Sequence, residues 1–556
     1  MDYQYLAELL FPHVKETPED IENRYPKRNL PEGAKVTRFA PSPTGFVHFG
    51  GLFPTRVGER LAHQSGGVFY LRIEDTDAKR EVAGAKDGLI RTLAHYGIEF
   101  DEGAVIGGDK GDYGPYMQSK RAAIYHVFAK KLVSEGKAYP CFTTDEELKA
   151  LETVDKKAEI KAKDWHEVTE DYHEIQLAWR NFTIEEVKAH LDAGHPFVLR
   201  MLADGDPDKK FKITDLIKGD LELPENDKDE VLLKSDGIPT YHFAHAVDDH
   251  LMGTTHVIRG EEWLPSLPRH IMLFRYLGFK APKYMHIAQL MNIDENGAKK
   301  KLSKRDKGTN LDDYERQGYA PECINEYIMT LLNSNYEEWH AANPDKSFEE
   351  FPFNIKKMST SGCLLDFGKL TDVSKNVLSR FSVDKIYSDT VAWAEKYDSD
   401  FAACLSADPE YSKRIFAIGR GGKKPRKDLT LFSDVKGYAG FFFDPYFEIL
   451  EPIDEKFSCA DIKKTLSAFL ETYSFADDMN VWFDKVKAIA ADLGYATDMK
   501  AYKADPTAYP GNVADVSAFI RVAVTGKQNS PDLYTVMQIL GETKVRERIN
   551  KMLESL

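Results

Sequence analysis

The chain has 556 residues, of which 42% are hydrophobic, and its formal net charge at pH 7 is −16. This length predicts about four domains with sizeable hydrophobic cores. The acidic balance argues against non-specific coating of nucleic acid, although a local basic groove can still exist on an acidic body.

Neither a membrane span nor a secretion signal is predicted. No run of 18 or more apolar residues occurs, and residues 1–29 are mixed and charged, without a basic stretch followed by an apolar one. The five cysteines are scattered and form no C-x-x-C pair, so neither a structural zinc nor a disulfide framework is expected. These features favour a reducing, cytoplasmic setting.

In chain order, residues 1–31 predict an extension with some helix, after which strands and helices alternate. A highly charged segment, 145–192, is interpreted as part of an insertion, and 292–300 as a loop. From residue 312 onward, helical spacing dominates. Strands are predicted at 35–39, 68–73, near Val198, and at 231–233, 240–244, 256–259 and 284–291; helices are predicted at about 51–63 (with Pro54 in the first turn), up to His95, and at 268–277.

The alternation of strands and helices predicts an α/β first half with a parallel sheet, followed by an all-helical second half. Ligands of such sheets bind beyond the carboxyl ends of the strands. Residues 38–51 and 74–77 both follow predicted strands, and we therefore expect the functional site there.

Residues 43–51 read PTGFVHFGG, a glycine-rich segment with one histidine. Gly45, Gly50 and Gly51 let the backbone approach a flat base and ribose, and His48 can donate to a phosphate oxygen. A helix that begins after Gly50 would aim free N–H groups at an anion. The alternative is a Pro/Gly turn with a surface histidine.

Residues 301–305 read KLSKR. Lys301 and Lys304 can neutralise a triphosphate in the transition state at the α-phosphate, and Ser303 can add a hydrogen bond. A solvated basic loop is the alternative, since short basic runs are common. With the glycine-rich segment, this loop indicates a site that activates a substrate with ATP.

A third group comprises Arg38, Glu74, Tyr241 and Arg259 at predicted strand ends. Two arginines, one acid and one phenol suit a small zwitterion with an extra carboxylate, because a guanidinium pairs with a carboxylate through two hydrogen bonds. Ordinary surface ion pairing is the alternative.

The segment 38–45, RFAPSPTG, resembles the opening of bacterial glutamyl-tRNA synthetases, which are class I enzymes. Their H-x-G-x signature matches 48–51, and their KMSKS-type loop matches 301–305. The resemblance runs from about Lys35 to Leu556, and further segments carry it: LRIEDTD at 71–77, GPY-x-QS at 114–119, LKSDG-x-PTYH at 233–242, VDDH at 247–250, VIRGEEW at 257–263 and IRVAVTG at 520–526.

The resemblance implies a glutamate-tRNA ligase with a Rossmann-type catalytic domain. It would activate L-glutamate with Mg-ATP and transfer it to tRNA(Glu), as a cytoplasmic, monomeric protein that needs Mg²⁺ and no zinc. The implied domains are an N-terminal extension (1–34), a catalytic domain (35–330) with an acceptor-binding insertion at about 115–230, a stem-contact domain (331–385) and an anticodon-binding domain (386–556).

Residue by residue, the resemblance assigns glutamate-site positions to Arg38, Ala40, Ser42, Glu74, Tyr241, His245 and Arg259, and ATP-site positions to His48, Gly50, Gly51, Glu262, Lys301, Ser303 and Lys304. His48, Lys301 and Lys304 are the expected catalytic residues. Arg38 and Tyr241 are expected on the side-chain carboxylate of glutamate, Glu74 on its ammonium and Arg259 near its α-carboxylate.

The sequence departs from the family at several positions. Gly51 stands where the class signature has a second histidine, and His245 stands where relatives often have asparagine. The basic segment 413–427 contains no acid, and Arg426 is the candidate for contact with an anticodon base. A solvated loop is the alternative. Two further alternatives for function stay open: an enzyme that also charges tRNA(Gln), or a non-charging paralogue that binds RNA.

Overall fold

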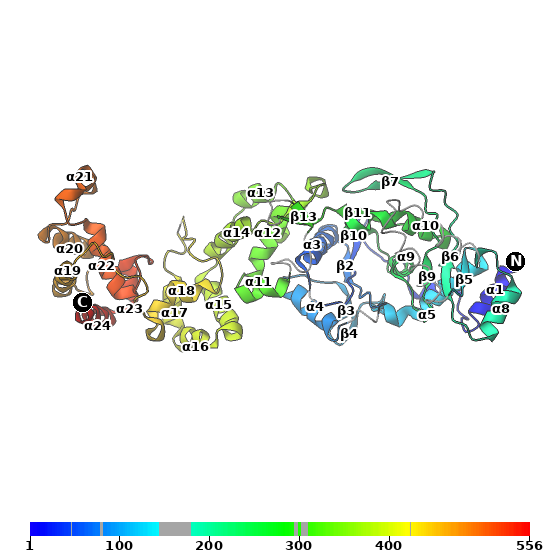
Figure 1. The fold of residues 1–556 in the computed structure, drawn as a ribbon, viewed down its shortest axis with the longest axis horizontal. Helices are drawn as coiled ribbons and strands as arrows, with labels where there is room; N and C mark the ends of the chain where they lie inside the picture. Colours follow the sequence, from blue (N-terminus) through cyan, green and yellow to red (C-terminus); the bar gives the residue numbers. More distant parts are fainter. Residues whose placement is uncertain (46, 78–81, 144–178, 294–298, 302–309, 423) are drawn as a thin grey trace, which may run out of the picture. The chain divides into compact units, whose positions relative to one another are not determined.

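The chain folds into two compact units in the computed structural model (Figure 1). The first unit comprises residues 1–312 and 328–366, and the second comprises 313–327 and 367–556. No helix in the described part of the chain has the length and apolar character needed to cross a membrane. The structure describes residues 1–45, 47–77, 82–143, 179–293, 299–301, 310–422 and 424–556.

The first unit is built around a parallel sheet. Strand β1 (Val36–Phe39) pairs in parallel with β2 (Val68–Leu71), and β2 pairs in parallel with β3 (Glu102–Val105). Strand β4 (Gly108–Lys110) adds to β3 in the antiparallel sense. Because β1, β2 and β3 run the same way, their carboxyl ends meet at one edge of the sheet.

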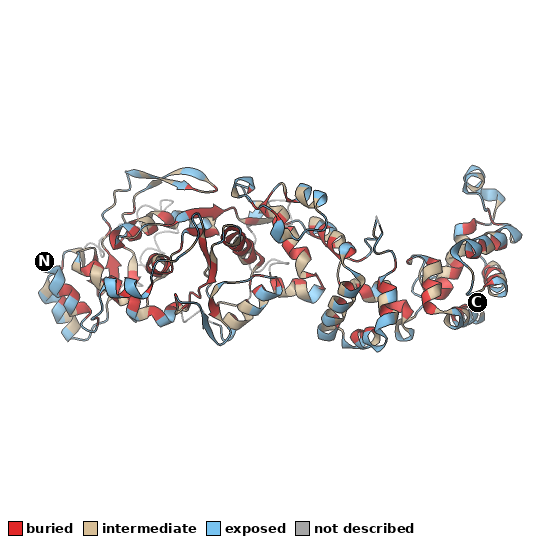
Figure 2. Cartoon of the chain, turned by 180° about the vertical axis from the view of Figure 1, so that it is seen from behind, coloured by how far each residue is buried: buried red, intermediate tan, exposed pale blue. Residues whose placement is uncertain are grey.

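A second parallel pair extends this arrangement. Strand β10 (His256–Gly260) pairs with β11 (Lys283–Ile287), and the Thr255 amide donates to the Val36 carbonyl at 2.9 Å, so β10 begins beside β1. Helix α3 (Phe49–Gln64) packs against β1, β2 and β10 (Figure 1). Figure 2 shows these strands and α3 as largely buried, so they form the core under the site.

Helix α3 begins two residues earlier than predicted, at Phe49, because His48 caps its N-terminus through its own side chain. Pro54 is therefore in the second turn and not in the first, which corrects the prediction. The missing N–H of Pro54 removes one helical hydrogen bond, and burial of α3 offsets this loss.

The N-terminal extension is docked on the first unit. Helices α1 (Tyr3–Leu10) and α2 (Pro18–Arg24) pack against α5 (Ala122–Ser134). Beyond them, Arg28 forms two hydrogen bonds of 2.8 Å with Glu102 on β3. The extension is thus held by packing against α5 and by a partly buried ion pair with the central sheet.

Between α5 and β10 lies a second group of strands. A hairpin of β7 (Lys210–Asp215) and β8 (Gly219–Pro224) reaches β11, where the Leu216 amide donates to the Tyr284 carbonyl at 3.0 Å. An antiparallel sheet has the order β5-β6-β9. The elements around it are β5 (Ala138–Cys141), α8 (Ile184–Asp192), β6 (Val198–Met201) and β9 (Val231–Leu233).

Two predicted strands differ in the structure. Residues 241–244 belong to helix α9 (Tyr241–Leu251), which Thr240 precedes, because Phe243, Ala246 and Val247 bury one helical face. Such a short apolar run does not distinguish helix from strand by itself. The predicted strand 284–291 is divided in two: β11 ends at Ile287, the Gln289 amide donates to the Glu261 carboxylate, and residues 290–291 begin another strand.

The chain then enters a small sheet in which β12 (Leu290–Ile293) lies between β13 (Lys299–Lys301) and β14 (Cys363–Leu364). The predicted α/β class of the first half and the helical second half are confirmed. The remaining longer helices are α4 (Ala85–His95), α10 (Leu267–Leu277), α11 (Leu311–Gln317), α12 (Pro321–Leu332), α13 (Tyr336–Ala342), α14 (Phe367–Arg380), α15 (Val383–Tyr397), α16 (Ser399–Ala407), α17 (Pro409–Phe416), α18 (Asp434–Ala439), α19 (Cys459–Thr472), α20 (Met479–Asp492), α21 (Met499–Ala504), α22 (Val513–Thr525), α23 (Leu533–Leu540) and α24 (Glu542–Ser555).

Candidate active site

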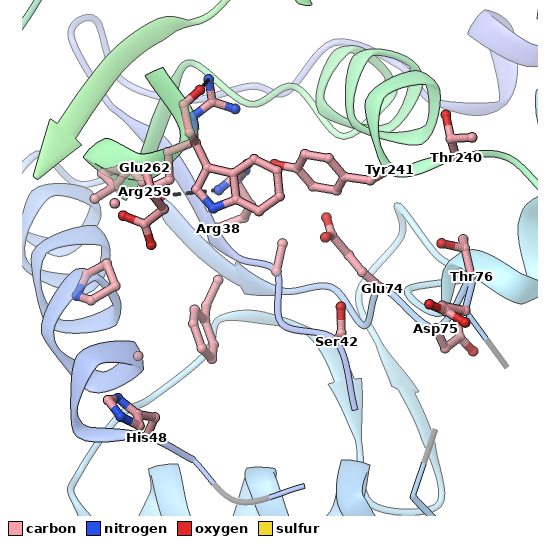
Figure 3. A pocket seen from close by; sticks show the side chains of 18 of the residues that line it. Arg38, Ser42, His48, Glu74, Asp75, Thr76, Thr240, Tyr241, Arg259 and Glu262 are labelled. Carbon is pink, nitrogen blue, oxygen red and sulfur yellow. Dashed lines mark hydrogen bonds between the residues drawn. The ribbon is translucent and has the colours of Figure 1, made fainter. Parts of the chain in front are cut away.

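A cavity of about 1330 Å³ opens in the first unit beyond the carboxyl ends of β1, β2 and β10 (Figure 3). Segments far apart in the sequence supply its walls. The predicted site residues among its lining are Arg38, Ala40, Ser42, His48, Gly50, Gly51, Glu74, Tyr241, Arg259 and Glu262.

His48 and the two following glycines form one wall at the start of α3. The Gly50 amide donates to Nδ1 of His48 at 2.9 Å. A Cβ on residue 50 would lie only 2.9 Å from that nitrogen, so the cap needs glycine there. Since Nδ1 accepts, the proton of the neutral ring is on Nε2, which makes Nε2 a donor. At Gly51, a Cβ would meet only Phe39, at 3.9 Å.

The floor of the cavity carries a charge-paired cluster of Arg38, Arg72, Glu74 and Asp249. Asp249 lies 3.2 Å from Nε of Arg38 and 2.6 Å from a guanidinium nitrogen of Arg72. Arg72 also donates to Glu74 at 3.1 Å. All four side chains are buried, so each ion pair acts in a medium of low polarity.

Burial raises the pKa of Glu74 to about 7, although Arg72 and Arg38 oppose this shift. Burial also disfavours the charged form of Asp249, but Arg38 and Arg72 outweigh it and hold its pKa well below the usual range. The two acids in one cluster therefore differ: Asp249 is a fixed anion, and Glu74 is balanced between two protonation states near neutral pH.

Tyr241, the first residue of α9, lies above the floor (Figure 3). Its ring is 4.6 Å from the Trp263 ring, centroid to centroid, and 5.9 Å from the nearly parallel ring of His245. Burial, and then the charge of Glu74, raise the pKa of the Tyr241 phenol. The phenol therefore stays protonated at neutral pH and can donate a hydrogen bond.

Arg259 extends from the carboxyl end of β10 and is held in a different way. Its guanidinium donates to Nε2 of His286 at 3.0 Å and to the Trp263 carbonyl at 3.3 Å, and lies 3.1 Å from Nδ1 of His270. It is also stacked over the Tyr284 ring, 5.0 Å from its centroid. Within the described residues, Arg259 forms no ion pair with a carboxylate.

His245 is fully buried and does not line the cavity. It lies behind Tyr241, with Nε2 at 3.0 Å from the Tyr284 hydroxyl and Nδ1 at 2.8 Å from Asp249. The structure thus places it beneath the pocket as a support for Tyr241 and the cluster. Direct substrate contact by His245 was expected, and this position does not favour it.

The predicted basic loop lies largely outside the described residues. Lys301 ends strand β13, and only its backbone is described. Ser303 and Lys304 are outside the described residues, so their roles stay predictions. Among the described residues, no group of three or more His, Cys, Asp or Glu side chains is arranged to hold a metal ion.

Arg426 belongs to the second unit and has no part in this cavity. It forms two hydrogen bonds with Asp428, at 2.5 and 3.1 Å, while its side chain keeps 47% exposure. Asp428 therefore holds the guanidinium in place without covering it.

Sequence reasoning missed several residues around the cavity. Arg72 and Asp249 stood in segments that carried the family resemblance, yet their pairing required the fold. Asp215, His270 and His286 stood in none of the recognised motifs, and their contacts with one another and with Arg259 arise only in the folded chain.

The cavity offers two guanidinium groups, one carboxylate of shifted pKa and one phenol within a single space. This set suits a small molecule with two carboxylates and one ammonium. The glycine-rich wall beside it, with Gly50, Gly51 and the imidazole of His48, lines the same cavity.

Comparison with known proteins agrees with this geometry. A family described as tRNA synthetases class I (E and Q), catalytic domain, matches residues 35–363, and an anticodon binding domain matches 511–553. The chain is 49% identical to a glutamate-tRNA ligase of Acetivibrio thermocellus and 45% identical to one of Clostridium perfringens, each over the full length of both chains.

Solved structures give the same result. The chain is similar to a glutamate-tRNA ligase from Elizabethkingia meningosepticum, whose crystal structure is described as a complex with its amino acid, with 26% identity and a TM-score of 0.72. The match covers 94% of this chain and 99% of the other.

Proposed function

This chain belongs to the glutamate-tRNA ligase family of class I tRNA synthetases, and we propose how the residues of its cavity perform that reaction. The predicted family, Rossmann-type fold class and ligase activity are confirmed by full-length relatives and by the matching catalytic domain. The proposed site is supported by one observation: all of the predicted glutamate-site residues except His245 line one cavity.

Glutamate binds with its charged groups distributed over the floor. Arg38 and the Tyr241 hydroxyl take the side-chain carboxylate, Glu74 takes the ammonium, and Arg259 takes the α-carboxylate. The proposal is supported by the burial of Arg38, Glu74 and Arg259, which strengthens each charge-assisted hydrogen bond. Ala40 and Ser42 line the same space.

This arrangement rejects glutamine, the near-isostere of glutamate. The neutral amide of glutamine cannot neutralise Arg38, and its NH₂ group would face a guanidinium that has only donors. A lost charge-assisted hydrogen bond of this kind costs about 1.5–3 kcal/mol. Preference for glutamate therefore follows from the charge of the floor.

ATP, which enters with Mg²⁺ as part of the substrate, lies along the glycine-rich wall. Nε2 of His48 donates to the phosphates. Gly50 and Gly51 carry no side chain that would fill the space beside the nucleotide, and Glu262 lines the same cavity. Lys301, Ser303 and Lys304 bring positive charge and one hydroxyl to the triphosphate, an assignment based on their sequence motif.

The reaction has two steps. An oxygen of the glutamate α-carboxylate attacks the α-phosphorus, the bond to the β-phosphate oxygen breaks, and pyrophosphate leaves, giving glutamyl adenylate. A hydroxyl of the terminal ribose of tRNA then attacks the acyl carbon, AMP leaves with the acyl–phosphate bond electrons, and the hydroxyl proton is released. The residues contribute mainly positioning and charge neutralisation.

Three regions and one residue are proposed to contact tRNA, and the regions keep their predicted boundaries. The insertion at about 115–230 binds the acceptor end, 331–385 contacts the stem, and 386–556 binds the anticodon region. Arg426 contacts an anticodon base, supported by its exposed guanidinium. Charging of anticodon-substituted tRNA by Arg426→Ala tests the last point: unchanged discrimination between anticodons would reject it.

Pyrophosphate exchange tests the whole proposal. The assay uses glutamate and ATP, first without tRNA and then with tRNA(Glu) or tRNA(Gln). Exchange with glutamate but not glutamine is expected, and loss of all activity under every condition would overturn the proposal and favour a non-charging paralogue. Charging of tRNA(Gln) with glutamate would instead identify the enzyme as non-discriminating.

A further inference from the structure

The guanidinium of Arg259 is oriented by neutral groups. Its three acceptors within hydrogen-bond distance are His286, His270 and a backbone carbonyl. Burial lowers the pKa of His286, and burial together with the neighbouring ring of His245 lowers that of His270 well below its usual value. Both rings are therefore neutral near pH 7, and no positive charge is added beside Arg259.

The direction of these hydrogen bonds fixes the proton of His286. A guanidinium can only donate, so Nε2 of His286 accepts and its proton is on Nδ1. Nδ1 faces Asp215, whose Oδ2 lies 2.7 Å away. The three side chains thus form one line, in which Arg259 donates to His286 and His286 donates to Asp215.

Asp215 is itself firmly held. It is buried at the last position of β7, and its carboxylate accepts backbone amides of Ile217 at 2.9 Å, Lys218 at 2.8 Å and His286 at 3.1 Å. Burial opposes the charge on Asp215, but the hydrogen bonds from His286 and these amides outweigh it and lower its pKa. The Asp215 carboxylate therefore contacts the His286 imidazole and not the Arg259 guanidinium, and the imidazole lies between them.

This separation has a consequence for binding. A carboxylate in direct contact with Arg259 would neutralise it and compete with a ligand carboxylate. A neutral imidazole fixes the direction of the guanidinium but leaves its charge available. The positive charge at the end of β10 is thus both oriented and unneutralised within the described residues.

We infer that His286, oriented by Asp215, is a positioning residue that aims the Arg259 guanidinium at the α-carboxylate of the bound amino acid, an inference that rests on the proposed glutamate site. It assigns a role to two residues that the sequence did not single out. One of them, Asp215, lies on the β7–β8 hairpin, so this hairpin takes part in shaping the amino-acid site.

Two substitutions of His286 separate its contact with Asp215 from its contact with Arg259. In His286→Asn, the side-chain amide can still donate to Asp215 but no longer reaches Arg259. In His286→Gln, a longer side chain restores an acceptor near Arg259. The control is His63→Asn, which removes another histidine–aspartate pair (His63 Nε2 to Asp101, 3.1 Å) away from the cavity lining.

Pyrophosphate exchange is measured at varied glutamate and varied ATP. In His286→Asn, the KM for glutamate is expected to rise about tenfold to a hundredfold, with the KM for ATP changed by less than about twofold. His286→Gln recovers most of the loss, Asp215→Asn gives an intermediate rise, and His63→Asn leaves both constants unchanged. Calorimetry should rank the glutamate affinities of these variants in the same order.

An unchanged glutamate KM in His286→Asn would overturn the inference while leaving the proposed function intact. Equal increases in the KM for glutamate and for ATP, without recovery in His286→Gln, would also overturn it, because they indicate general damage to the fold. Failure of the unsubstituted protein to use glutamate at all would refute the proposed function itself, and the two failures are therefore distinguishable.

Discussion

Two arginines reach the same cavity from neighbouring strands, and their surroundings differ. Arg38, on β1, belongs to the charge-paired cluster, in which Asp249 contacts both Arg38 and Arg72. Arg259, on β10, is held by the neutral rings of His270 and His286. The anion Asp215 contacts His286 and is separated from Arg259 by that imidazole ring.

The difference shows two ways to prepare a buried guanidinium for a ligand. In the cluster, ion pairs compensate for the desolvation of the arginines, but a ligand carboxylate must share Arg38 with Asp249. On the Arg259 side, neutral acceptors supply direction without sharing the charge. We therefore expect substitutions at Arg38 to disturb the whole floor, and substitutions at Arg259 to act more locally.

The largest effect is expected for Arg38→Ala. The substitution removes the contact to the glutamate side chain and breaks a buried ion pair with Asp249. A bidentate contact to the substrate carboxylate has two charge-assisted hydrogen bonds of about 1.5–3 kcal/mol each, so kcat/KM for glutamate should fall on the order of a thousandfold. The broken pair with Asp249 should lower folding stability in addition. ATP affinity, measured separately, should change little; an equal loss of both would contradict the assignment of Arg38 to glutamate.

Arg259→Lys is expected to have the next largest effect. Lysine keeps the charge but cannot contact His286, His270 and the Trp263 carbonyl from one planar group. The KM for glutamate should rise about tenfold to a hundredfold, while the unfolding temperature changes little. A matching Arg38→Lys variant with a smaller effect on glutamate than Arg259→Lys would reverse the comparison.

The pH dependence of glutamate binding should follow the ionisation of Glu74 in the charge-paired cluster and not that of the histidines. Burial raises the pKa of Glu74 to about 7, and only the ionised form attracts the glutamate ammonium. The ionised fraction grows about tenfold from pH 6 to pH 8, so affinity should rise with pH by about that factor and then level off. In Glu74→Gln the rise should be absent; a wild-type affinity that is flat over this range would argue against Glu74 as the ammonium partner.

The sequence predicted the cavity well where motifs follow strands. Arg38, Glu74 and Arg259 come directly from strand ends, and parallel strands bring such ends together. It could not predict the partners that hold these side chains. Asp215, on a hairpin, meets His286, 71 residues later, only because β7 packs beside β11. The short run 240–244 was ambiguous for a related reason, since its helical face is defined by burial that the sequence alone does not show.

His245 connects the two sides and gives the smallest expected effect. Its ring lies 2.8 Å from Asp249 of the cluster, and its ring centroid is 4.6 Å from that of His270 beside Arg259. Burial, with the charges of Arg38 and Arg259, outweighs Asp249 and lowers its pKa to about 4. The folded protein thus keeps this histidine neutral in acid, while the unfolded chain takes up a proton near its ordinary pKa of 6.5.

Stability should accordingly fall as the pH drops from 6.5 toward 4, and the contribution of His245 to this loss is absent in His245→Asn. Glu74, whose pKa is raised, has the opposite sign, but it is common to both proteins and cancels in their difference. Between pH 6.5 and 5.5 the free energy of unfolding of the unsubstituted protein should drop by about 1 kcal/mol more than that of His245→Asn. Urea denaturation at both pH values measures this difference. Equal losses of unfolding free energy in the two proteins would mean that His245 is already protonated in the folded state. The residue between the charge-paired cluster and Arg259 would then be a cation and not a neutral ring.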